Sequence, residues 1–121
     1  MRAVICLAFL GSVVASVALA QTSCVAPDQP ASVDGATATL DELKAAISLV
    51  KQFIASSDAY QACLGKEIDV QKAAATPDKP FDKAIATRNM ALADTNQKMK
   101  ESVGASVNAA IVSYKKAHPA N

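Results

Sequence analysis

The sequence predicts an all-α fold, an antiparallel two-helix hairpin with an extended N-terminal arm and one disulfide. Two long segments, about 39–75 and about 81–116, carry apolar residues at helical spacing, and a short proline-containing turn separates them. Two cysteines remain once an N-terminal leader at 1–20 is removed, and an even pair in an exported domain indicates one bridge. No run of alternating β-branched and aromatic residues indicates a strand.

Residues 1–20 have the three parts of a cleavable secretory signal peptide. Arg2 supplies a positive charge, an uncharged apolar run follows, and residues 18–20 carry small side chains at the two positions that a signal peptidase reads. The run is shorter than the about 20 apolar residues of a membrane anchor, so we expect cleavage before Gln21 and no membrane span afterwards. Lipid attachment at Cys24 is a lesser alternative, because Gln21 stands where a lipidation site prefers an apolar residue.

The chain that remains after cleavage is small and electrically neutral. Removing 20 of the 121 residues leaves 101, enough for one domain. Arg2 is the only charged residue of the leader, so 11 basic residues then balance 11 acidic ones. Such a chain offers no basic surface to nucleic acid or to an anionic membrane, and we expect no nucleic-acid partner.

Residues 21–38 predict an extended arm that precedes the first helix. Pro27 and Pro30 lack an amide proton and bias their neighbours away from helix, whereas Asp34-Gly35 is a turn signal. No helical or strand periodicity occurs in this segment, so it needs another element to hold it in place.

Cys24 and Cys63 are the expected disulfide. The 15 residues from Cys24 to Thr39 span up to about 50 Å when extended. Cys63 lies about 36 Å along the axis of a helix that starts at Thr39. The arm can therefore fold back along the hairpin and reach Cys63, although a bridge between two chains remains the alternative.

We expect each helix to bury one stripe of residues that recur at intervals of three and four. The first begins at a capping box, in which Thr39 and Glu42 each satisfy the other's backbone amide. Its stripe is Leu40, Leu43, Ile47, Val50, Ile54, Ser57, Gln61, Leu64 and Ile68. The second stripe is Ile85, Asn89, Leu92, Asn96, Met99, Val103, Val107, Ala110 and Tyr114. Antiparallel pairing that sets Gln61 against Asn96 also sets Val50 against Val107, so we expect Gln61 and Asn96 to form a polar layer that specifies the register.

No pattern of residues indicates catalysis or metal binding. His118 has no ligand partner in the sequence, and neither a glycine-rich phosphate loop nor a nucleophile elbow occurs. Glu67 and Asp69 do not share a helical face, and the spacing of Asp78 and Asp82 suits the start of a helix. We expect no catalytic residue, metal or cofactor.

Four segments resemble a set of small uncharacterised proteins exported by Gram-negative bacteria. These segments are Cys24–Pro30, Asp34-Gly35 with Ala38, Tyr60–Leu64, and Asn108–Lys115. The proteins in question share a signal peptide, an arm with Cys and Pro, a Tyr-x-x-Cys-Leu in the first helix and a Tyr-Lys near the end of the second. The resemblance implies export to the periplasm, and it carries no activity, substrate or site residue.

These observations favour a non-enzymatic structural or protein-interaction module in the periplasm. Two helices bury one stripe between them, and Phe53, Tyr60 and Phe81 widen that stripe, so we expect an apolar face that needs a protein partner or a second copy. The alternative is a small-ligand-binding protein that uses the region of Gln61 and Asn96. An enzyme is the third possibility and has the least support.

Overall fold

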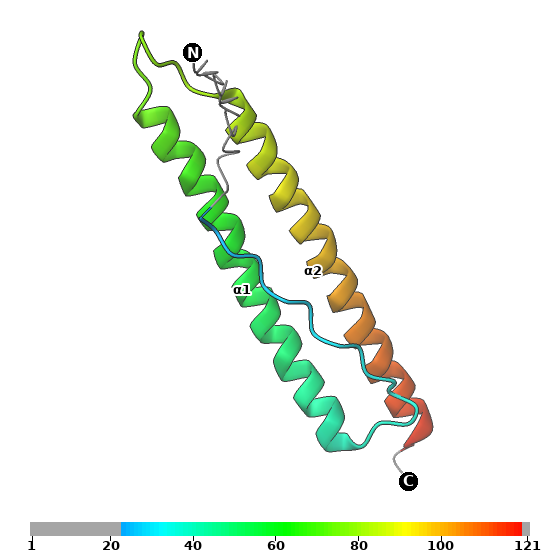
Figure 1. Cartoon of the computed structure of the whole chain (residues 1–121). Helices are drawn as coiled ribbons and strands as arrows, with labels where there is room; N and C mark the ends of the chain where they lie inside the picture. The colour runs from blue at the N-terminus through cyan, green and yellow to red at the C-terminus, as the bar shows by residue number, and fades with distance from the viewer. Residues whose placement is uncertain (1–22, 120–121) are drawn as a thin grey trace, which may run out of the picture.

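The computed structural model describes residues 23–119 and shows an antiparallel hairpin of two helices. Helix α1 spans Leu40–Ala73 and helix α2 spans Lys83–Ala117, within two residues of the bounds predicted from the sequence. The arm that precedes α1 runs back along both helices (Figure 1). The predicted fold class, with its arm and single disulfide, is confirmed. The predicted signal peptide, 1–20, lies outside the described residues.

Local chemistry sets the start of each helix. In α1 the amide of Glu42 donates to the Thr39 hydroxyl at 3.2 Å, and the amide of Thr39 donates to the Glu42 carboxylate at 2.8 Å, which confirms the capping box. In α2 the carboxylate of Asp82 accepts from the amide of Ala84 at 2.9 Å. These bonds satisfy amides that have no partner within the helix.

The turn between the helices is short, so α1 and α2 are neighbours along their length (Figure 1). Thr76 and Lys79 exchange backbone hydrogen bonds of 2.9 and 3.1 Å, which close the turn on itself. Within residues 23–119, neither helix has an apolar stretch long enough to cross a membrane.

Two apolar clusters lie between the elements. One contains Val50, Phe53 and Val103, so it joins the first half of α1 to the second half of α2. The other contains Cys24, Tyr60 and Leu64, so it joins the arm to α1. A polar layer lies beside these clusters, where the sequence predicts the pairing of Gln61 with Asn96.

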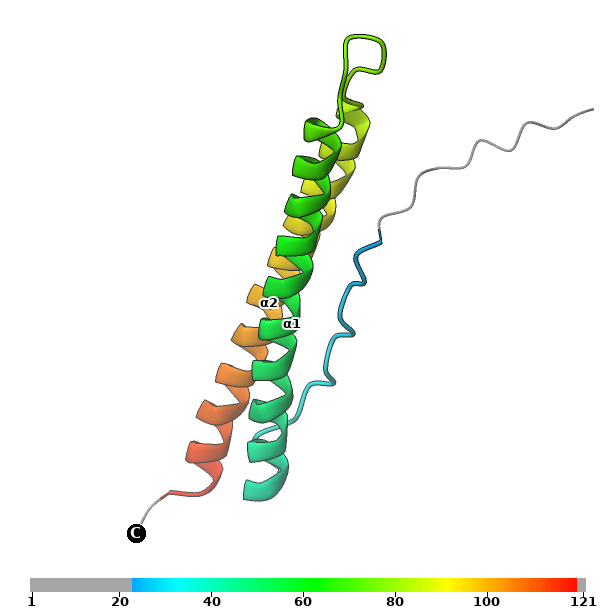
Figure 2. The ribbon, with the colours of Figure 1, turned by 90° about the vertical axis from the view of Figure 1, so that its left-hand side faces the viewer.

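The arm lies on one face of the hairpin, as the turned view shows (Figure 2). This arrangement corrects one expectation. Phe53 and Tyr60 were predicted to remain on an open face, yet they are only 4% and 7% exposed. Tyr60 packs with Cys24 of the arm, and Phe53 packs with Val50 and Val103. Since the chain itself covers these two rings, they do not form a surface that needs a partner.

Candidate functional site along the arm

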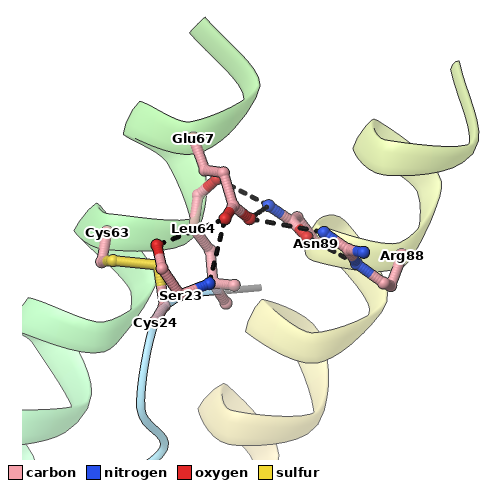
Figure 3. Close-up of a disulfide and its surroundings, with 7 residues drawn as sticks. All are labelled: Ser23, Cys24, Cys63, Leu64, Glu67, Arg88 and Asn89. Carbon is pink, nitrogen blue, oxygen red and sulfur yellow. Dashed lines mark hydrogen bonds and ion pairs between the residues drawn. A yellow bond between two sulfur atoms is a disulfide. The ribbon is translucent and has the colours of Figure 1, made fainter. Parts of the chain in front are cut away.

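The first anchor of the arm is covalent. Cys24 and Cys63 form the predicted disulfide, with their Cα atoms 5.8 Å apart (Figure 3). That separation lies within the usual range for a bridge, about 4.4–6.8 Å. Cys24 is buried and packs with Tyr60 and Leu64, whereas Cys63 is partly exposed at the edge of the same cluster. The bridge therefore fastens the arm to the second half of α1.

A polar cluster reinforces this anchor (Figure 3). The Glu67 carboxylate accepts a hydrogen bond from the amide of Ser23 at 3.1 Å on one oxygen. Its other oxygen accepts from Asn89 Nδ2 at 2.7 Å and pairs with the Arg88 guanidinium at 3.4 Å. One carboxylate thus connects the arm, α1 and α2.

Asn89 is fully buried at the centre of that cluster, and every polar group of its amide is used. It donates to the Leu64 carbonyl at 3.1 Å as well as to Glu67, and its oxygen accepts from Arg88 Nε at 3.0 Å. Sequence reasoning placed Asn89 in the buried stripe but did not find this cluster. A polar residue at a stripe position was the available signal, yet its partners become neighbours only when the helices and the arm pack.

The predicted polar layer is present. Gln61 donates to the Asn96 side-chain oxygen at 2.9 Å, so the two residues face each other. Two further members were not predicted. Asn96 Nδ2 donates to the hydroxyl of the fully buried Ser57 at 3.2 Å, and Gln61 also donates to Gln97 at 3.3 Å. These amides bond to one another and line neither of the two hollows described below.

The second anchor of the arm is a close fit instead of a bond. The Asp34 carbonyl accepts from the amides of Thr37 and Ala38 at 3.3 and 2.9 Å, which confirms the predicted turn. Gly35 sits in this turn so close to α2 that an added Cβ would overlap the carbonyl oxygen of Ala110. Only glycine fits at this contact.

Between the anchors, residues 25–33 form no hydrogen bond within the part of the chain that the structure describes. Two hollows flank this stretch. The inner hollow, about 200 Å³, lies between Gln29–Val33 and both helices, where Val50 and Val103 form part of its wall. The outer groove, about 310 Å³, lies between Pro27–Pro30 and the α1 side chains Leu49, Gln52, Phe53 and Ser56.

The residue types that commonly bind metals are scattered along residues 23–119. No three His, Cys, Asp or Glu side chains in that range are placed to hold a metal ion together. His118 stacks on Tyr114, with ring centroids 4.2 Å apart, at the end of α2. The distinctive features of the chain are therefore the anchored arm and the two hollows beside it.

Comparisons of the chain with protein-family models, with curated proteins and with solved structures give no match.

Proposed function

We propose that the protein is a non-enzymatic structural or protein-interaction module of the periplasm. The observation that supports this proposal is that the anchored arm leaves apolar side chains exposed to solvent on itself and on the adjoining helix face. Val25, on the arm, and Leu49, on the adjoining face of α1, are both exposed although the arm is fixed at its two ends. Exposed apolar side chains on a scaffold of fixed shape favour contact with another protein, because binding then orders few residues.

The interior of the hairpin supports the same proposal. Within residues 23–119, no buried side-chain nitrogen or oxygen lacks a hydrogen-bond partner. The buried amides and hydroxyl therefore serve the fold itself, and the outer surface remains for recognition. The disulfide is compatible with an oxidising compartment, which supports export to the periplasm.

The experiment is capture of partners by the tagged, exported protein after crosslinking in the periplasm. A defined partner that co-purifies with the native protein is expected, and sedimentation of the purified protein reports self-association. A matched bait carries Leu49→Asp, which changes the exposed apolar surface without touching the core. If neither bait captures a partner and the protein stays monomeric, the interaction role is wrong.

Small-ligand binding is the second candidate, and the inner hollow is the observation that favours it. Its wall combines apolar residues, including Val33, Val50 and Val103, with Ser102 and Ser106. None of the residues in the range 23–119 that line it is charged. This hollow, rather than the polar layer at Gln61 and Asn96, is the place for an uncharged ligand. A thermal-shift screen with small neutral compounds tests this candidate, and a hit should be lost when Ser106 is replaced by Leu.

A further inference from the structure

The outer groove has one wall of extended backbone and one wall of helix. The arm stretch Pro27–Pro30 forms the first wall, and Leu49, Gln52 and Phe53 of α1 belong to the second. Phe53 is buried at the groove, whereas Leu49 is about half exposed in it. The groove thus offers apolar surface beside a peptide chain in an extended conformation.

The backbone beside this groove is available for pairing. The amides of Ala26, Asp28 and Gln29 donate no hydrogen bond to any residue in the range 23–119. An extended segment with unpaired backbone groups is a template onto which a second extended segment can add, with its side chains entering pockets alongside. Pro27 and Pro30 limit such pairing to a short stretch between and just before them.

Charge narrows the class of partner. Among the residues that the structure describes, Asp28 is the only charged one that lines the groove. It is exposed and forms no salt bridge with any residue that the structure describes. A carboxylate at the rim favours a cationic side chain over an anionic one.

The volume of the outer groove restricts the class of partner further. A hollow of about 310 Å³ lies near the lower limit of small-ligand pockets, which is about 300 Å³. It holds one anchoring side chain rather than a whole folded element. Because the arm that forms one wall has unpaired backbone groups, the occupant that this groove favours is a short extended segment and not a helix of a second copy.

We propose that the outer groove binds an extended segment of a partner protein, with one apolar side chain against the exposed part of Leu49 and one basic side chain at Asp28. This inference rests on the proposed interaction role and specifies where and what the module binds. Backbone pairing at residues 26–29 would set the direction of the segment, and the apolar anchor would supply most of the affinity.

The test uses the full exported protein, with its disulfide intact, to select from a phage library of random heptapeptides. Selected peptides should combine a Lys or Arg with an aliphatic or aromatic residue. Synthetic copies of them should bind the Leu49→Asp variant at least about tenfold more weakly, because the variant removes the apolar contact. Val112→Asp is the matched control, since Leu49 and Val112 are each 52% exposed, and it should leave binding unchanged.

Asp28→Lys tests the charge separately, and it should shift the selection towards acidic peptides. The groove proposal is wrong if no selected peptide depends on Leu49, or if Leu49→Asp and Val112→Asp weaken binding equally. Circular dichroism checks that each variant stays folded. If the Leu49→Asp bait still captures a partner from the periplasm, the interaction role stands and only its placement in the groove fails.

Discussion

The interface between α1 and α2 and the interface between the arm and the hairpin are held in opposite ways. Between the helices, one apolar cluster joins Val50 to Val103, and hydrogen-bonded side chains at Asn96 and Asn89 add contacts farther along the hairpin. The arm, in contrast, is fixed at one end by the Cys24 bridge with the adjoining Ser23 hydrogen bond and at the other end by Gly35, and residues 25–33 form no hydrogen bond within the range 23–119.

The difference shows how an element without periodicity becomes part of a fold. A helix presents a side chain to its neighbour at every turn, so its contacts are repeated and its register is specified many times. The arm has no such repeat, and its position depends on two local contacts. Each of those contacts should therefore have a large effect when it is removed, whereas single changes between the helices should have smaller ones.

Removal of the bridge should have the largest effect. Cys24 and Cys63 are separated by 39 positions, and in the chain-entropy model a loop of this size contributes about 4 kcal/mol. Cys24→Ser with Cys63→Ser should lower the free energy of unfolding by roughly that amount, as measured with urea. The reduced wild type is the control and should behave like the double variant. Unchanged stability would show that the noncovalent contacts alone hold the arm.

One added methyl group at Gly35, the second anchor, should lower the stability of the protein. Gly35→Ala is expected to cost about 1–3 kcal/mol, because the new Cβ overlaps the Ala110 carbonyl oxygen and the arm must move. Gly65→Ala is the matched control. An added Cβ at Gly65 meets no atom within 4 Å, and Gly65 lies inside α1, so the substitution should stabilise the protein by about 0.5–1 kcal/mol. Thermal unfolding of both variants measures the difference, and equal shifts would show that Gly35 is not a close contact.

The polar layer allows a test between the helices. Replacing both Gln61 and Asn96 by Leu removes the Asn96 side-chain amide that donates to the Ser57 hydroxyl. This buried hydroxyl then loses its hydrogen-bond partner. Adding Ser57→Ala to the double replacement should therefore recover about 1 kcal/mol. The triple variant should also exceed the wild type in melting temperature and populate more than one oligomeric state, because the apolar layer no longer penalises a slipped register. A triple variant that sediments as a single monomeric species would show that the oligomeric state does not depend on this layer.

The smallest effect should come from the capping box. The backbone amide and the hydroxyl of Thr39 both donate a hydrogen bond to the Glu42 carboxylate. The hydrogen bond from the backbone amide is the main reason that the pKa of Glu42 lies below its ordinary value of 4.5. Stabilisation from this lowered pKa is present above pH 4.5 and is lost as the pH falls through the folded-state value.

Glu42→Gln keeps a side-chain acceptor for the cap but does not titrate. Thermal unfolding from pH 6 to pH 3 should show the wild type more stable than the variant at the upper end, with the difference shrinking as the pH falls. The full chain carries other carboxylates, so only the difference between the two proteins tests the cap. A difference that does not change with pH would contradict the role of the charge.

Sequence alone determined the features that depend on local spacing. Thr39 and Glu42 are three residues apart, so the capping box could be predicted from their positions, and the proline-containing turn between the helices made them neighbours. Antiparallel pairing then placed Gln61 opposite Asn96, since a periodic stripe allows few registers. The bridge between Cys24 and Cys63 followed from their number and from the length of the arm.

Only the tertiary structure decided what covers the face with Phe53 and Tyr60. The arm has no periodicity to reveal which surface it contacts, and its anchors unite residues distant in the sequence, Gly35 with Ala110 and Ser23 with Glu67. The outer groove beside Leu49 has the same origin, because its two walls become neighbours only when the arm folds back along α1. The spacing of apolar residues in a helix indicates which face packs against a neighbour, so the sequence alone predicts that contact. An extended segment without such spacing gives no sign of the surface that it contacts, and only the folded structure shows it.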